Sequence, residues 1–144
     1  MRQYLVVANQ TLGGEHLIGR IREYAAAGPS RFHVVVPATR PTDHIWSEGE
    51  VTAAAQDRLD VALAAIRALG AEADGEIGDP NPLRAVEDAF LDRQFDEIIL
   101  STLPPGLSKW LSLDLPGRVA TRFEVPVTHV VSSAEPTETG SKAS

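Results

Sequence analysis

Apolar residues along the chain follow two patterns, short continuous runs and longer stretches with helical spacing. Continuous runs at residues 4–8, 32–36, 98–100 and 127–131 are typical of strands buried on both faces of a parallel sheet. Between these runs, the spacing of apolar residues predicts four helices. Their apolar positions are Leu17, Ile18, Ile21, Tyr24 and Ala25; Val51, Ala55, Leu59, Ala62, Ile66 and Leu69; Leu83, Val86 and Phe90; and Val119, Ala120 and Phe123.

Polar residues and breakers mark where these helices begin and end. Ser47 and Glu50 have the spacing of a capping box, which predicts the start of the second helix, and Gly70 ends it. Asn81 is expected to cap the third helix, because proline at the following position favours a first helical turn. The last helix is expected from about Pro116.

Residues 71–77 have the alternating pattern of a strand with one face in water. Small or apolar residues occupy the odd positions, and Glu72, Asp74 and Glu76 occupy the even ones. Such a strand belongs at the edge of a sheet. Five strands alternating with helices predict one doubly wound parallel α/β sheet, in the order 3-2-1-4-5, with helices on both faces. Its topological switch point lies between strands one and four, so we expect a crevice lined by residues 9–13 and 101–106.

Composition limits the class of protein. The length of 144 residues suits one domain, which we place at residues 1–132. Residues 133–144 lack large apolar side chains and are expected to form a flexible tail. A net charge of −7, with scattered basic residues, argues against a nucleic-acid partner. No apolar run approaches the length of a membrane span, and no export signal is evident, so we expect a cytoplasmic protein.

Metal and thiol chemistry find little support in the sequence. The chain has no cysteine, which removes disulfides, thiolate ligands and cysteine nucleophiles. His16, His33, His44 and His129 show no ligand spacing and are read as surface or strand histidines, so we expect no metal site. No hydrolase elbow, Walker loop or dinucleotide fingerprint occurs.

Several segments together resemble a universal stress protein domain over about residues 4–131. They are YLVVANQT at the first strand, Gly78-Asp79-Pro80 before the third helix, DEIILST at the fourth strand, and Pro126-Val127 at the fifth. The resemblance implies the same five-stranded fold, a nucleotide loop after the fourth strand, and a homodimer formed through the fifth strand, residues 125–131.

The loop after the fourth strand departs from the pattern of the ATP-binding members of this family. Their three glycines correspond here to Ser101, Pro104 and Gly117. Twelve residues separate Pro104 from Gly117, and Arg118 stands where the pattern has a residue with a hydroxyl group. In a second register Gly106 is the middle glycine and Leu103 the first. Proline has no N–H group to donate to a phosphate, so we expect ATP to bind weakly or not at all.

The candidate binding residues surround the expected crevice. The only cofactor that the sequence suggests is a nucleotide such as ATP or another small anion. The N-terminus of the last helix suits an anion, with Arg118 adding charge, and Asn9 could pair with a base or ribose. The alternative is that Arg118 is a solvated arginine and Asn9 and Thr11 are ordinary loop residues. The full set is Asn9, Thr11, Ser101, Thr102, Gly106, Gly117 and Arg118.

The two tryptophans fall in segments expected to be loops near the crevice. Trp46 and Trp110 could cover a ligand, or they could pack against leucines of their own loops. Leu107, Trp110 and Leu111 would share one face if that loop formed a helical turn. Such a face would also suit a protein partner.

Two functions remain open on the sequence. The first is a dimeric, universal-stress-protein-like regulatory domain that works as an interaction module without a ligand. The second is a sensor of a nucleotide or other small anion bound at the switch point. We expect binding rather than turnover; a weak ATPase is a third alternative that the resemblance permits, although no base or metal-binding carboxylate presents itself.

Overall fold

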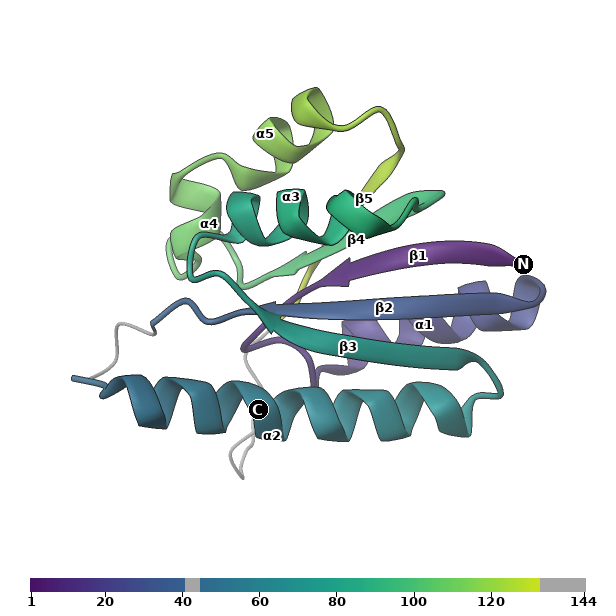
Figure 1. The fold of residues 1–144 in the computed structure, drawn as a ribbon, viewed down its shortest axis with the longest axis horizontal. Coiled ribbons are helices and arrows are strands. Elements are labelled where there is room, and N and C mark those ends of the chain that lie inside the picture. Colours follow the sequence, from purple (N-terminus) through teal and green to yellow (C-terminus); the bar gives the residue numbers. More distant parts are fainter. Residues whose placement is uncertain (41–44, 133–144) are drawn as a thin grey trace.

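The computed structural model describes residues 1–40 and 45–132 (Figure 1). Five parallel strands form one sheet in the order β3-β2-β1-β4-β5, as the sequence predicted. The strands are β1 (Arg2–Val7), β2 (Ser30–Pro37), β3 (Glu72–Gly78), β4 (Glu97–Thr102) and β5 (Val127–Val131). The helices of the described ranges are α1 (Glu15–Ala27), α2 (Glu48–Ala68), α3 (Pro82–Asp92), α4 (Lys109–Ser112) and α5 (Leu115–Arg122).

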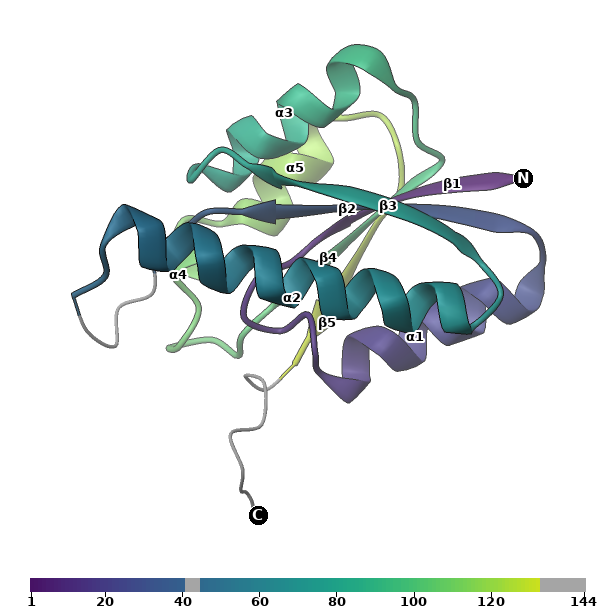
Figure 2. The same cartoon turned by 60° about the horizontal axis from the view of Figure 1, so that its bottom comes forward.

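Helices cover both faces of the sheet, as expected for a doubly wound fold. α1 and α2 lie on one face, and α3 and α5 lie on the other (Figures 1 and 2). Each face has its own apolar cluster, because successive strand residues point to opposite sides. Val6 and Ile99 belong to the cluster under α1 and α2, whereas Leu5 and Leu100 belong to the cluster under α3 and α5. The sheet is therefore buried on both faces at its centre.

Both predicted helix caps are confirmed. Ser47 Oγ accepts a hydrogen bond from the Glu50 backbone N–H at 3.1 Å, and Glu50 Oε1 accepts one from the Ser47 N–H at 2.9 Å. Asn81 Oδ1 accepts from the N–H groups of Leu83 and Arg84. These caps fix the starts of α2 and α3 at the residues where the sequence placed them.

The segment between β4 and the last helix differs from the expected loop. It contains the short helix α4, which begins where Ser108 Oγ accepts from the Leu111 N–H at 3.1 Å. Trp110 is thus helical and buried, while Leu107 stays 71% exposed. A helical turn does form in this segment, but it begins at Lys109, so Leu107 lies just before it and a face shared by Leu107, Trp110 and Leu111 stays a prediction.

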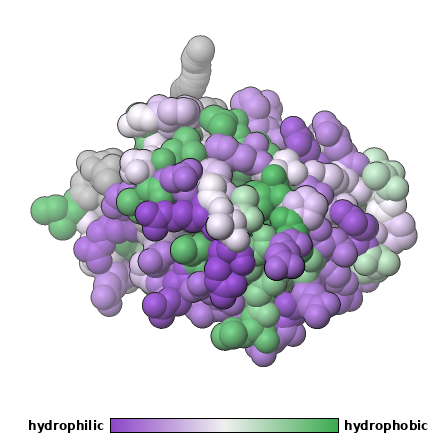
Figure 3. All heavy atoms as spheres, turned by 90° about the horizontal axis from the view of Figure 1, so that it is seen from above, coloured by the Kyte–Doolittle hydropathy of each residue, from purple (hydrophilic) through white to green (hydrophobic). Residues whose placement is uncertain are grey.

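The outer surface over α3 and α5 has no broad apolar face. Apolar and polar side chains are interspersed there (Figure 3). Leu91 and Leu113 are among the exposed large apolar residues of the described ranges; Leu91 lies on α3 and Leu113 in the turn between α4 and α5. Across residues 1–40 and 45–132, the structure contains no helix with the length and apolar character needed to cross a bilayer.

Candidate functional site

A pocket opens at the carboxyl ends of the three central strands. Its enclosed space is about 60 Å³, and the hollow reaches about 470 Å³ only when the open solvent at its mouth is counted. The chain leaves β1 toward α1 and leaves β4 toward α4, so the two loops part at this edge and leave a hollow between them. The lining residues are Asn9, Gln10, Thr11, Thr39, Arg40, Ser101, Thr102, Leu103, Leu107, Ser108, Lys109 and Trp110.

Asn9 closes the side of the pocket nearest β2. Its Nδ2 donates to the carbonyl oxygen of Pro37 at 2.9 Å, and its Oδ1 accepts from Arg58 Nη1 at 2.9 Å. Only one orientation of the amide satisfies both partners, since a carbonyl accepts and a guanidinium donates. The buried Asn9 side chain therefore ties the loop after β1 to the end of β2 and to α2.

Hydroxyl groups form the floor of the pocket. Thr11 Oγ1 and Ser101 Oγ lie 2.6 Å apart, which joins the loop that follows β1 to the end of β4. Thr102 Oγ1 lies 2.8 Å from His129 Nε2, on the opposite face of β4. Partial burial lowers the pKa of His129 below its ordinary value, so its neutral ring is favoured beside this hydroxyl. Each hydroxyl can both donate and accept, which suits a ligand with ribose-like or amide groups.

A hydrogen bond between distant segments holds the far wall in place. Trp110 Nε1 donates to Thr39 Oγ1 at 3.2 Å, and Thr39 Oγ1 donates to the carbonyl oxygen of Pro80 at 2.7 Å. These contacts fasten α4 to the loop that follows β2. The pocket wall is consequently built from three loops that tertiary hydrogen bonds hold together.

Apolar and cationic side chains complete the pocket. Leu103, Leu107 and Trp110 give it one apolar side, against which a flat ring could pack. Arg40 and Lys109 are exposed lining residues, and no acidic residue of the described ranges lines the pocket. The pocket thus combines neutral hydrogen-bonding groups, an apolar wall and positive charge.

The structure brings together four of the seven candidate site residues. Asn9, Thr11, Ser101 and Thr102 are all buried lining residues. Gly106 is in an exposed turn with a φ of +89°, and it does not line the pocket. Gly117 and Arg118 are in the first turn of α5 and also lie outside the lining set.

The N-terminus of α5 has an anionic side chain of its own. A Cβ placed on Gly117 would lie 2.6 Å from Asp114 Oδ2, so the carboxylate rests directly on this glycine. Asp114 itself has a φ of 53°, in the left-handed region that non-glycine residues rarely adopt. A carboxylate in this position already interacts with the positive end of the helix dipole.

Sequence reasoning missed Thr39, Arg40, Ser108 and Lys109 as lining residues. The expected crevice was drawn from the loops after strands one and four alone. The strand order also places β2 beside β1, so the loop after Pro37 opens at the same edge, and this signal could have identified Thr39 and Arg40. The position of Ser108 and Lys109 depends on α4, a helical turn that the spacing of Leu107, Trp110 and Leu111 allowed but did not require.

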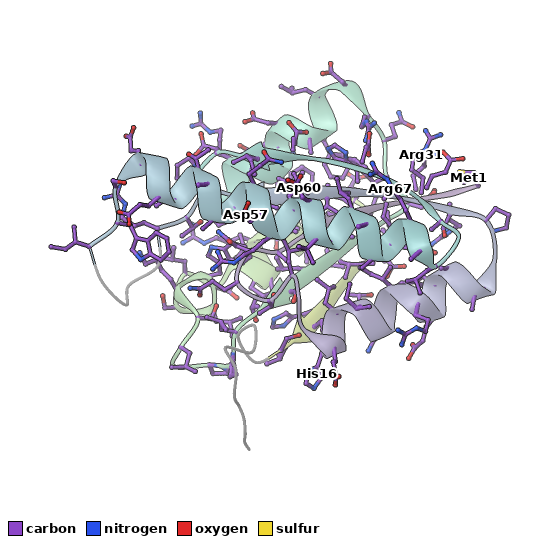
Figure 4. The ribbon with its side chains drawn as sticks, turned by 90° about the horizontal axis from the view of Figure 1, so that it is seen from below. Met1, His16, Arg31, Asp57, Asp60 and Arg67 are labelled. Carbon is purple, nitrogen blue, oxygen red and sulfur yellow. The ribbon has the colours of Figure 1, made fainter. Side chains whose placement is uncertain are left out.

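Neither the histidines nor the acids of the described residues form a metal site. No group of three or more potential ligands gathers within residues 1–40 and 45–132. His33 is on β2 and His129 on β5, while His16 projects outward at the start of α1 (Figure 4). His44 lies outside the described residues.

Solved structures of universal stress proteins match this fold over most of their length. A universal stress protein from Archaeoglobus fulgidus matches with a TM-score of 0.58 and 18% identity, covering 90% of this chain and 93% of that one. The Archaeoglobus fulgidus protein in complex with dAMP matches with a TM-score of 0.55 and 14% identity, covering 90% and 98%. A universal stress protein in complex with cAMP gives 0.58 and 18%, covering 92% and 98%. The chain therefore has the universal-stress-protein fold.

Comparison by sequence adds nothing to this likeness. No protein-family model and no curated protein matches the chain.

Proposed function

We propose that this chain is a non-catalytic domain that binds a nucleotide or another small anionic molecule in the pocket at the ends of β1 and β4. One observation carries the proposal. Buried hydroxyl and amide groups line one side of the pocket, leucines line the other, and the charged lining residues within residues 1–40 and 45–132 are all cations. This arrangement suits a ligand with a flat ring, a polar middle and a negative group.

The structural neighbours support the choice of ligand class. Two of the solved universal stress proteins are complexes with dAMP and with cAMP, each of which carries a single phosphate. The proposal extends this ligand class to the present chain through the shared fold and its own pocket. Binding without turnover, and a cytoplasmic location, belong to the proposal as expectations from the sequence.

Calorimetry with adenosine monophosphate and adenosine tests the proposal. We expect saturable binding of at least one of them to the full chain. Leu107→Ala should weaken that binding about tenfold, because a leucine side chain in contact with a ring contributes about 1.4 kcal/mol or less. Leu113→Ala is the matched control, since Leu113 is 53% exposed and does not line the pocket. Absence of binding by both compounds, or equal effects of the two variants, would contradict the proposal.

The second candidate is a ligand-free interaction module, and the loop after β4 favours it. Pro104 and Pro105 have no N–H groups, and Asp114 occupies the start of α5, so this segment offers few donors to a phosphate. The same calorimetry separates the two candidates. A chain that binds neither compound would leave the interaction module as the better reading.

We also propose that the domain forms a homodimer through β5. This strand pairs only with β4, so its outer backbone groups have no partner within the described chain. Pairing with β5 of a second copy around a two-fold axis would satisfy those groups. The boundary of the domain at residue 132 remains a prediction, because residues 133–144 lie outside the described ranges.

A further inference from the structure

The charge of the pocket is opposite to the charge of the whole chain. The chain has a formal net charge of −7, with 20 acidic residues against 13 lysines and arginines. The pocket nevertheless has two cations, Arg40 and Lys109, and no acid among the lining residues that the described part of the chain contributes. A local positive charge on an acidic protein raises the local concentration of anions.

Both cations have side chains that remain available to a ligand. Arg40 and Lys109 are exposed, and within residues 1–40 and 45–132 no carboxylate forms an ion pair with either of them. Some other arginines of the described chain are paired with an acid, as Arg93 is with Asp74 at 2.6 Å. Within residues 1–40 and 45–132, the two pocket cations therefore meet an incoming anion without first giving up a carboxylate partner.

The fold holds these two cations at one wall of the pocket. Each is adjacent in sequence to a partner in the Trp110–Thr39 hydrogen bond, which fastens α4 to the loop after β2. Ser108 fixes the start of α4 by accepting from the Leu111 N–H. Two segments about 70 residues apart in sequence thus present one cation each to the same space.

The start of α5 is a weaker place for an anion. The carboxylate of Asp114 rests on Gly117, and a second anion there would be repelled by it. Arg118, the cation expected from the sequence to hold a ligand, does not line the pocket.

We propose that Arg40 and Lys109 together bind the phosphate of a small organic phosphate monoester, whose uncharged part lies against Leu103 and Leu107. This inference rests on the proposed function and assigns its charged contact to particular side chains. Binding by two solvated side-chain charges makes the affinity for the phosphate depend on ionic strength, because exposed charges are screened by salt. Backbone donors would depend on salt much less.

Calorimetry with adenosine monophosphate and adenosine, on the full chain and three variants, tests the inference. Arg40→Gln and Lys109→Gln should each weaken binding of the monophosphate about fivefold, and the double variant about 20-fold. Adenosine should bind all of them within about a factor of two, because it lacks the charge. Between about 50 and 300 mM salt, the preference of the unaltered chain for the monophosphate should fall.

Arg118→Gln is the matched control, with the same loss of charge at an exposed residue outside the pocket. It should leave the affinity for both compounds unchanged. If adenosine binds and Arg40→Gln and Lys109→Gln leave the preference for the monophosphate intact, the inference is wrong while the proposed function stands. If Arg118→Gln weakens binding of the monophosphate more than Arg40→Gln and Lys109→Gln do, the phosphate binds at α5. That result would also overturn the inference. If neither compound binds the unaltered chain, both proposals fail.

Discussion

The two edge strands of the sheet have opposite chemistry. β3 is covered with charges that find partners: Arg31 pairs with Glu72 at 2.6 Å, and Asp74 contacts both His33 at 2.9 Å and Arg93 at 2.6 Å. At β5 the outward-facing residues include Val131, which is 42% exposed, and no ion pair within the described residues involves this strand.

This difference separates a protected edge from one available for pairing. Charged side chains along an edge strand oppose pairing with another strand, because their desolvation would be costly. β3 therefore ends the sheet in solvent. β5 lacks this protection, which is why we place the dimer interface there and not on β3. The comparison can be tested by altering each edge in turn.

The largest expected effect is at β3, where a glycine allows α2 to approach the strand closely. A Cβ on Gly75 would lie 2.5 Å from the Val34 carbonyl oxygen and 2.7 Å from Leu59 Cδ1. Gly75→Ala should lower the free energy of unfolding by about 3 kcal/mol, since the nearest atom belongs to the backbone and cannot turn away. Urea denaturation measures the loss.

Gly19→Ala is the control for this substitution. Gly19 lies within α1, and a Cβ there would have no atom within 4 Å, so alanine should stabilise the chain by about 0.5–1 kcal/mol through helix propensity. A Gly75→Ala variant as stable as the unaltered chain would show that β3 can move away from both the Val34 carbonyl on β2 and Leu59 on α2.

At β5, a charge should break the proposed dimer. Val131→Glu should raise the dimer dissociation constant at least about tenfold, because pairing would bury an unpartnered carboxylate. Sedimentation equilibrium measures the constant. Val61→Glu on α2 is the matched control, since Val61 is 64% exposed and distant from β5 in the fold. Val130 cannot serve here because it is part of the core. An unaltered chain that stays monomeric at about 20 µM would contradict the dimer.

The contrast between the edges was largely predictable from the sequence. The alternation of Glu72, Asp74 and Glu76 with small residues placed β3 at an edge, because period two assigns residues to faces directly. The continuous apolar runs likewise placed the buried strands. The pairing of Asp74 with Arg93 was not predictable, since these residues come from different elements and only the packing of α3 brings them together.

The binding pocket was predictable in position but only partly in composition. Strand order alone placed it at the switch point, and Asn9 and Ser101 followed from their positions after two central strands. Lys109 and Trp110 depend on how the segment after β4 folds back, and that is set by tertiary hydrogen bonds such as Trp110 to Thr39. Helical spacing over four residues is too short to predict such an element.

A smaller effect concerns the paired charges of β3 in acid. Burial by itself would raise the pKa of Asp74, but hydrogen bonds from Arg93 and His33 outweigh it and lower that pKa to about 2. The unfolded chain then binds more protons than the folded one between about pH 4 and pH 2, so stability should fall as the pH is lowered through this window.

Arg93→Gln should make that fall shallower and should cost about 0.5–1 kcal/mol at neutral pH, a figure that allows for solvent screening of a half-exposed pair. Arg84→Gln, at an exposed arginine on the same helix side of the sheet, should leave the acid dependence unchanged. Denaturation at several pH values measures both. Identical curves for the two variants would show that Arg93 does not protect the carboxylate.

The smallest effect is expected from His129 on β5. Partial burial lowers the pKa of this histidine below its ordinary value, and burial in a dimer would lower it further. Protonation therefore opposes both folding and association, so the dimer dissociation constant should rise modestly, by about two- to threefold, as the pH falls from about 7.5 to 5.5.

His129→Gln should remove this dependence, because glutamine keeps a hydrogen bond to Thr102 without titrating. His16→Gln, at the exposed start of α1, should retain it. Sedimentation at several pH values compares the three chains. If the dimer dissociation constant of His129→Gln still depends on pH, another group senses the pH. In that case β5 is not where the two copies meet.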